Sequence, residues 1–455
     1  MDHPPLYPFQ EEAGRIERHC KLPLHTGIGG IENQADSLHP LQKAISHWQR
    51  VSGKRIVAPS EVEFNASCLV PATGNCLIFL RNQSGVRLNR LFGEGLTIEG
   101  ENADGRFRLS CHHYYVKATS SSGEEPAWAI ASPVNCLASI IYREAGPIAR
   151  VTAVIDNFDF ECGNWPPDAN HPQREKILRV EASGHIVDFT KREDHAILRH
   201  LLDIGLLHST SLVTFSFAAW EGSSEEDLTA FAYNIASLCS IVARQHTGIP
   251  VLSFFDEDGR VVKRLLGNAI ESEFRSNYIL RFLHFEAGLP KLFRKCFDEH
   301  VKMQKLDLWT RLPPLCAGIE DPPYLEQKCA TLMAALELLI RNSLIELGHY
   351  STEQAQKIMF PGLISAARKK LLWDIPPHYT AGDRYRLLRN AVSHGGQLPG
   401  EAKQVRHDFD KWVLFLMRRY LLRLGFDGDV ASPDQGLASS SSVGDFSKEH
   451  NSFET

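Results

Sequence analysis

The sequence lacks any apolar run near the roughly 18–20 residues that a membrane span needs. Its N-terminal stretch, MDHPPLYPFQEEAGR, has an acid and prolines but no apolar core, so it does not read as a secretory signal. None of the ten cysteines lies in a C-x-x-C pair or in a dense array. We therefore expect a cytoplasmic protein without a membrane partner, whose thiols are reduced and mostly buried.

Signatures of common enzyme sites are also missing. The glycines of HTGIGG, residues 25–30, have no strand before them and no Lys-Ser or Lys-Thr after them, so they do not form a phosphate loop. No Gly-x-Ser-x-Gly elbow is present. His112 and His113 in CHHYY are adjacent, and on a strand they would point to opposite faces. We expect no cofactor and no metal.

Neither sign of charge is in large excess. The net charge of −6 excludes a basic field over the whole protein. Residues 320–427 carry 15 Lys and Arg against 12 Asp and Glu, or +3, which leaves 34 against 43, or −9, for the remainder. This distribution allows a slightly basic C-terminal domain on an acidic body.

The first half of the sequence is rich in short strands. Apolar and polar residues alternate in segments such as EVEFNASCLV and RVTAVIDNF, and turn residues separate GLTIEGEN from GRFRLSC and ILRVEA from GHIVDF. We expect an N-terminal extension at 1–55 and a β-rich domain at 56–222, with WPPDANHPQ, 165–173, as a loop inside it.

Helical patterns dominate the second half. A connecting region at 223–319 begins with a helix, which starts at a serine and stops at Gly248, and continues with a hairpin that turns at Asp258-Gly259. Apolar stripes then predict helices at about 270–304, 323–348, 354–372, 381–394 and 400–424. We expect a helical bundle at 320–427 and a disordered, serine-rich tail at 428–455, which makes the fold class α+β.

One predicted helix end in this half brings together three side chains that could act in catalysis. In YRLLRNAVSHGGQ, Asn390 and His394 are four residues apart and share a helix face, while Arg389 reaches the same end. The glycines that follow stop the helix, so His394 lies in the last turn, where the helix dipole favours its protonated form. A histidine that titrates near neutral pH can transfer a proton, and a guanidinium can hold a phosphate. The three side chains together predict metal-free RNA cleavage.

The motif and its surroundings resemble a HEPN domain. That family is an α-helical bundle whose ribonuclease members carry Arg, a polar residue, three further residues and His, as Arg389, Asn390 and His394 do here, often with a glycine after the His. The resemblance covers roughly 320–427. A strand-rich N-terminal half, the VLSFFDEDGRVV hairpin and a C-terminal bundle are together similar to the ApeA-type bacterial proteins of anti-phage abortive infection.

The resemblance implies a function. The chain would be an endoribonuclease that acts as a defence or toxin effector, with RNA, tRNA being one candidate, as its substrate. It would form a homodimer through the bundle, because HEPN nucleases share one cleft between two motifs, and would leave a 2′,3′-cyclic phosphate and a 5′-hydroxyl. The N-terminal region would restrain the nuclease or sense a phage-derived trigger.

Two other interpretations stay open. Some HEPN domains are not catalytic, so the bundle would instead serve as an interaction or dimerisation module beside a ligand- or protein-binding β domain. Arg389 would then pair with an acid on the first bundle helix, for which Glu337 is the candidate. The other is an accessory role in nucleotidyl transfer or ligand binding, which rests only on other uses of the HEPN fold.

Overall fold

The structure is a computed structural model. It describes residues 49–57, 60–69, 77–82, 96–102, 105–111, 114–121, 126–133, 138–141, 146–160, 177–203, 210–266, 274, 278–280, 288–375, 402–431 and 440–442. Contacts divide the chain into two units, one of residues 1–71 and 76–138 and the other of residues 72–75 and 139–455. All the described helices belong to the second unit.

The first unit contains a seven-stranded sheet with the strand order β5-β4-β1-β2-β3-β7-β6. Its neighbouring strands pair in antiparallel fashion. At the predicted turn between β4 and β5, Asn102 pairs with Gly105. The strands are β1 (Gln49–Val57), β2 (Ser60–Leu69), β3 (Leu77–Asn82), β4 (Leu96–Asn102), β5 (Gly105–Cys111), β6 (Tyr114–Ser121) and β7 (Pro126–Pro133).

The second unit contains another seven-stranded sheet, with the order β10-β11-β12-β9-β13-β14-β8. The strands expected within 56–222 are therefore divided between two sheets, and the second sheet also takes in the hairpin expected in the connecting region. Alternation along a strand does not reveal which sheet the strand joins. The strands are β8 (Ala138–Ile141), β9 (Arg150–Asp156), β10 (Ile177–Ala182), β11 (His185–Lys191), β12 (Val213–Ala218), β13 (Gly248–Phe255) and β14 (Val261–Leu266).

Both predicted hairpins of this sheet are confirmed, each with a suitable turn. Between β10 and β11, Ser183 and Gly184 both have positive φ, 50° and 76°, as a type I′ turn requires. Between β13 and β14, Gly259 has a φ of 75°. There the carboxylate of Asp256 accepts a 2.8 Å hydrogen bond from the backbone N–H of Arg260.

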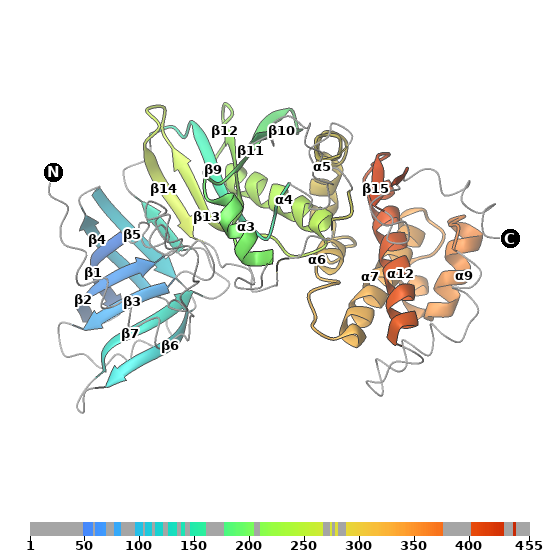
Figure 1. Ribbon diagram of the computed structural model, residues 1–455, viewed down its shortest axis with the longest axis horizontal. Helices are drawn as coiled ribbons and strands as arrows, with labels where there is room; N and C mark the ends of the chain where they lie inside the picture. The colour runs from blue at the N-terminus through green and yellow to red at the C-terminus, as the bar shows by residue number, and fades with distance from the viewer. Residues whose placement is uncertain are drawn as a thin grey trace. The chain divides into compact units, whose positions relative to one another are not determined.

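Helix α4 (Glu225–Ala243) packs against strands β9 and β13 of this sheet (Figure 1). It begins as predicted, because Ser224 and Asp227 form a capping box. Its end differs from the prediction: Arg244, not a glycine, takes the left-handed conformation with a φ of 52°. The expected stop, Gly248, is instead the first residue of β13.

The helices expected at 323–348 and 400–424 are confirmed as α7 and α12. The helix expected at 270–304 begins only at Leu289, and the one expected at 354–372 is divided into α8 and α9. Helix α7 packs against α6, α8, α9 and α12, and α5 packs against α4 and β10. The expected helix at 381–394 lies outside the described residues. Helices α3 and α6 were not predicted, and α3 interrupts the strand-rich half. The helices are α3 (His195–Asp203), α5 (Leu289–Lys305), α6 (Leu312–Ala317), α7 (Leu325–Glu346), α8 (Thr352–Lys357), α9 (Phe360–Lys370) and α12 (Ala402–Arg423).

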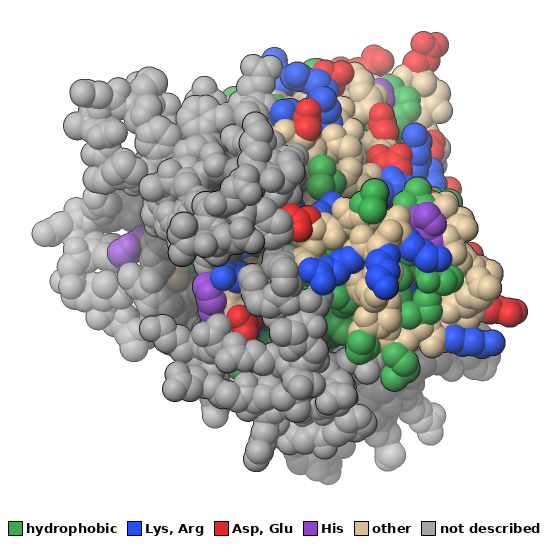
Figure 2. Space-filling view, turned by 90° about the vertical axis from the view of Figure 1, so that its right-hand side faces the viewer, with side chains coloured by type: hydrophobic (Ala, Val, Ile, Leu, Met, Phe, Trp, Pro, Cys, Tyr) green, Lys and Arg blue, Asp and Glu red, His purple; other side chains and the backbone are tan. Residues whose placement is uncertain are grey.

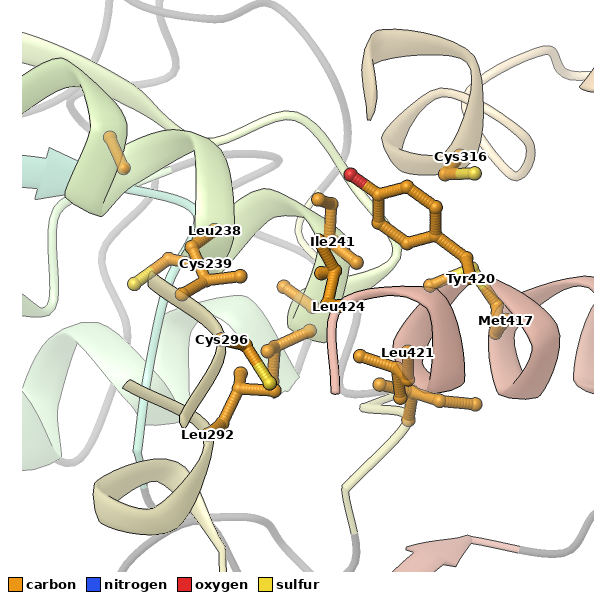
Figure 3. Packing of buried hydrophobic residues seen from close by; sticks show 14 of the residues in the cluster. Leu238, Cys239, Ile241, Leu292, Cys296, Cys316, Met417, Tyr420, Leu421 and Leu424 are labelled. Atoms are coloured by element: carbon orange, nitrogen blue, oxygen red, sulfur yellow. The ribbon is translucent and has the colours of Figure 1, made fainter. Parts of the chain in front are cut away.

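A single cluster of buried apolar side chains runs from the second sheet into the helices. Figure 3 shows its middle, where side chains of α4, α5, α6 and α12 meet, among them Cys239, Cys296, Cys316 and Tyr420. Within the segment expected to be disordered, β15 (Asp429–Ala431) and β16 (Ser440–Ser442) pair as a short antiparallel ladder. Among the described helices, none has the length and apolar character to span a membrane.

Candidate functional site

The residues of the predicted site, Arg389, Asn390 and His394, lie outside the described residues, in the segment 376–401. The helices on either side of this segment are described: α9 ends at Lys370 and α12 begins at Ala402. Both helices pack against α7. The segment that carries the motif is thus joined at each end to a helix packed on α7.

The chain that leaves α9 is anchored before it reaches the motif. The Arg368 side chain donates two hydrogen bonds, of 3.1 and 2.7 Å, to the backbone oxygen of Ile375. The backbone N–H of Trp373 donates to the oxygen of Ala367 at 3.0 Å. On α12, the Arg419 guanidinium lies 5.3 Å from the centroid of the Trp373 ring. The approach to the motif is therefore held by α9 and α12 as far as Ile375.

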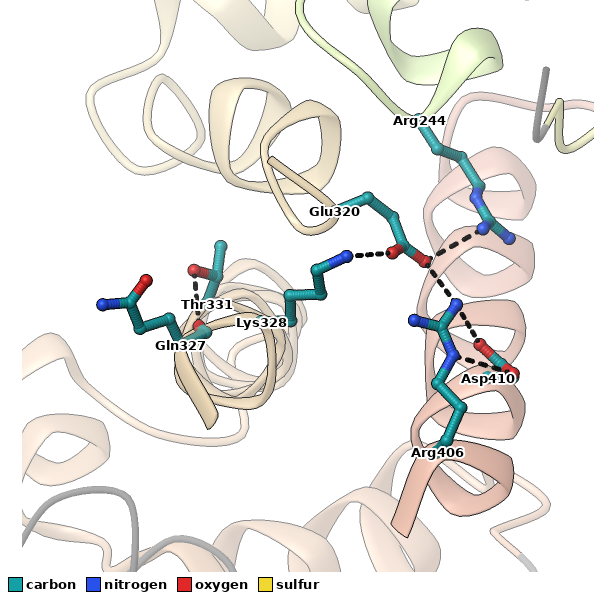
Figure 4. Close-up of polar contacts among 7 residues, drawn as sticks. All are labelled: Arg244, Glu320, Gln327, Lys328, Thr331, Arg406 and Asp410. Carbon is teal, nitrogen blue, oxygen red and sulfur yellow. Dashed lines mark hydrogen bonds and ion pairs between the residues drawn. The ribbon is translucent and has the colours of Figure 1, made fainter. Parts of the chain in front are cut away.

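On the other side of the motif, the first turns of α12 meet a buried carboxylate. Glu320, between α6 and α7, lies 3.1 Å from Arg244, 3.2 Å from Lys328 and 3.4 Å from Arg406. Arg406 also lies 3.0 Å from Asp410, one turn further along α12 (Figure 4). This Glu320 cluster joins the end of α4, the first turn of α7 and the beginning of α12.

Charge, and not burial, determines the ionisation of Glu320. Burial alone would raise its pKa, but the positive charges of Arg244, Arg406 and Lys328 together outweigh burial and hold the pKa below the ordinary value of 4.5. The ionised carboxylate is therefore the stable form at neutral pH. The cluster fixes the part of α12 that directly follows the motif.

Glu337, the predicted partner of Arg389, lies on α7 and is half-buried. Its carboxylate lies 3.5 Å from the Arg341 guanidinium, four residues along the helix. Arg341 in turn donates to the backbone oxygens of Ala355 and Ile358, which binds α7 to α8 and to the residue that ends it. The pairing of Glu337 with Arg389 stays a prediction, because Arg389 lies outside the described residues.

A second group of buried polar side chains, at the end of β9, was not predicted. The carboxyl of Asp156 accepts a hydrogen bond from the Ser211 hydroxyl. The Oδ2 atom of Asp159 lies 3.1 Å from Nε2 of His195, and the backbone N–H of Asp159 donates to the Tyr278 hydroxyl at 2.8 Å. The only sequence signal was the run Asp-Asn-Phe-Asp that directly follows an alternating strand.

The β9 group contains carboxyl, imidazole and hydroxyl groups of the kind that transfer protons in enzymes, but all of them are buried. Burial raises the pKa of Asp156 to about 7, although the Ser211 hydroxyl and the charge of Arg192 both act to lower it. Asp156, Asp159, His195 and Ser211 are each less than a tenth exposed. We interpret the group as an internal polar core that fastens the chain after β9 to β12 and α3.

A third polar centre surrounds His300 on α5. Its Nε2 atom lies 3.1 Å from the Ser237 hydroxyl and 2.7 Å from the side-chain nitrogen of Gln304, so Nε2 is the acceptor. The other ring nitrogen faces the Tyr420 hydroxyl at 3.4 Å. Burial lowers the pKa of His300 to about 4. The ring is therefore neutral at physiological pH and acts as a hydrogen-bonded part of the core.

Four cysteines of the second unit have structural thiols. Cys239, Cys296, Cys316 and Cys329 are all free and buried, as expected. Burial raises the pKa of Cys296 and of Cys329 to about 12, and that of the other two well above the ordinary value. Within the ranges that the structure describes, no three His, Cys, Asp or Glu side chains come together as metal ligands.

The sequence matches no protein-family model, no curated protein and no solved structure. The functional argument therefore rests on the motif and on the helices that flank it.

Proposed function

We propose that this chain is a metal-independent endoribonuclease of the HEPN type that acts as an anti-phage defence or toxin effector. The observation that carries the proposal is the motif itself: Arg389, Asn390 and His394 at one predicted helix end, closed by two glycines. A guanidinium, an amide and an imidazole at that spacing are the groups that cleavage of a ribose phosphate needs.

The proposed reaction is an internal transesterification. One His394 takes the proton of a ribose 2′-hydroxyl, and the 2′-oxygen forms a bond to the neighbouring phosphorus. The bond from that phosphorus to the 5′-oxygen of the next nucleotide breaks, and this oxygen takes a proton from the His394 of a second copy. Arg389 stabilises the negative charge on the phosphorus oxygens, and Asn390 orients the imidazole. The products carry a 2′,3′-cyclic phosphate and a 5′-hydroxyl.

The described surroundings of the motif support this proposal in one respect. Catalytic groups must be held in a defined geometry, and this requires rigid elements on either side of them. Arg368 and Arg419 anchor the chain before the motif, and the Glu320 cluster anchors α12 after it. Restraint of the nuclease falls, in this proposal, to the N-terminal region, since a free ribonuclease would harm its own cell.

The test is RNA cleavage in EDTA. Purified protein is incubated with total tRNA and with a single-stranded RNA, beside the variants His394→Ala and Arg389→Ala. We expect cleavage by the wild type with cyclic-phosphate ends, and a loss of at least about a hundredfold in each variant, because proton transfer and charge stabilisation each contribute about that much or more.

Two matched variants control for the general effect of removing a cation. His349→Ala and Arg260→Ala each remove an exposed side chain of the same type elsewhere in the chain, and both should cleave as the wild type does. Normal cleavage by His394→Ala or Arg389→Ala would show that the site assignment is wrong. If the wild type neither cleaves RNA nor is toxic when over-expressed, and His394→Ala changes neither result, the non-catalytic interaction module is the better interpretation.

A further inference from the structure

The last turn of α9 presents two exposed lysines, Lys369 and Lys370. The Lys370 ammonium lies 3.9 Å from the centroid of the Tyr350 ring, which follows α7. In the part of the chain that the structure describes, neither lysine has a carboxylate partner. Figure 2 looks at the side of the molecule where α9 lies and shows Lys and Arg side chains beside hydrophobic ones, with Asp and Glu side chains also on this face.

A comparison with α5 shows that a helix end alone does not explain this arrangement. Helix α5 also ends in two lysines, and cations are favourable at any helix C-terminus. However, Lys302 lies 3.8 Å from Glu299. Lys305 adds to the lowering of the Asp227 pKa that the Ser224 hydrogen bonds mainly cause. The lysines of α5 therefore face acids, whereas those of α9 face no acid among the described residues.

The position of these lysines along the chain links them to the motif. Leu372, which has a left-handed φ of 53° and is 81 % exposed, follows the last turn of α9. The chain is then anchored at Ile375 and runs into the segment that carries the motif. Lys370 precedes Arg389 by 19 residues. An RNA cut at the motif carries further phosphates on both sides of the cleaved bond, and these need cations.

We propose that Lys369 and Lys370 bind the phosphodiester backbone of the RNA that the motif cleaves. This inference rests on the proposed ribonuclease function and adds to it a second contact surface, outside the motif. Lysine suits the role, because its ammonium group binds phosphate as a point charge without reading the base sequence.

The test compares two double variants in a chain that carries His394→Ala and therefore does not cleave. Lys369→Gln with Lys370→Gln removes the proposed contact, and Lys302→Gln with Lys305→Gln removes the same charge from the last turn of α5. Binding of a fluorescein-labelled single-stranded RNA is followed by fluorescence anisotropy over a range of NaCl concentrations. Circular dichroism establishes that each variant is folded.

Loss of two phosphate contacts should reduce the slope of log K against log [NaCl] by about 1.4, and should weaken binding roughly tenfold at about 0.1 M salt. The α5 variant should keep the parent slope. Equal slopes in both double variants would overturn the inference. If the wild type still cleaves RNA in that case, the proposed function stands and only this contact is wrong.

Two further outcomes distinguish failure of the lysine contact from failure of the proposed ribonuclease function. If the parent chain binds no RNA and the wild type cleaves none, both the contact and the proposed function fail. If the α9 variant instead loses binding to vesicles of anionic phospholipid, while no chain binds RNA, the lysines contact a membrane surface and the inference is wrong.

Discussion

Asp156 at the end of β9 and Glu320 between α6 and α7 are both carboxyl groups with an exposed fraction of 1 %. Burial raises the pKa of Asp156 to about 7, because the Ser211 hydroxyl and the charge of Arg192 together lower the pKa by less than burial raises it. Burial acts in the same direction on Glu320, but three cations within 3.4 Å reverse the result.

The difference shows that partners, and not depth, decide whether a buried acid is charged. Asp156 stabilises the fold as a neutral acid that accepts a hydrogen bond from Ser211. Glu320 does so as an anion that compensates the charges of helices α4, α7 and α12. The two groups should therefore respond to pH in opposite directions.

The largest effect should come from removing the charge of Glu320. Glu320→Gln leaves three cations facing an uncharged amide in a buried site, which should lower the free energy of unfolding by about 3–5 kcal/mol. Urea denaturation at pH 7 measures the loss. The control is Asp410→Asn, which removes a carboxylate from a more exposed pair with Arg406 and should cost less than about 1 kcal/mol. Similar losses in both variants would contradict the central role of Glu320.

Asp156→Asn should change the pH dependence of stability. The stability that the neutral Asp156 contributes is fully present below the ordinary pKa of 3.8 and is lost as the pH rises through about 7. The variant cannot ionise, so between pH 4 and pH 8 it should gain up to about 4 kcal/mol relative to the wild type. Urea denaturation at several pH values measures this difference. Asp258→Asn, at an exposed hairpin tip, should show no such trend, and a trend in Glu320→Gln of the same sign as in Asp156→Asn would contradict the comparison.

His300 offers a third, somewhat smaller effect. Its folded pKa of about 4 lies below the ordinary 6.5, so the native state favours the neutral ring. The contribution of His300 to stability should therefore fall by about 3 kcal/mol as the pH drops from 6.5 to 4, which opposes the gain from Asp156 over a similar range. Replacing His300 by Asn should remove this contribution, so the variant should gain more stability on acidification than the wild type, as thermal unfolding followed by circular dichroism would show. His349→Asn, at an exposed position, should keep the slope of the wild type.

Local chemistry made several elements predictable. The capping box of Ser224 and Asp227, the Ser183-Gly184 turn and the Asp258-Gly259 turn each involve residues close in sequence, so their patterns indicate structure directly. The helices at 325–346 and 402–423 also followed from their apolar stripes.

Long-range partnerships were not predictable. Arg244 pairs with Glu320 across 76 residues, and Arg406 does so across 86. Asp156 meets Ser211 across 55 residues. No spacing rule connects such positions, so the sequence did not indicate the partners in either polar centre. The sequence did not predict that the strands are divided between two sheets for the same reason, since strand pairing is also a long-range property. At the motif, the sequence alone predicts the roles of Arg389, Asn390 and His394, while the structure describes only the helices α9 and α12 that flank the motif.

The continuous apolar core in Figure 3 has a consequence for how this protein can be divided. Cys239 and Ile241 of α4 lie in the same cluster as Tyr420 and Leu424 of α12, on opposite sides of the expected domain boundary at 319/320. Cutting the chain there would expose both halves of that core to water. The C-terminal helices should therefore not fold as an independent domain. A fusion protein that contains them needs α4 and α5 as well, or polar substitutions on the surface that α4 and α5 cover.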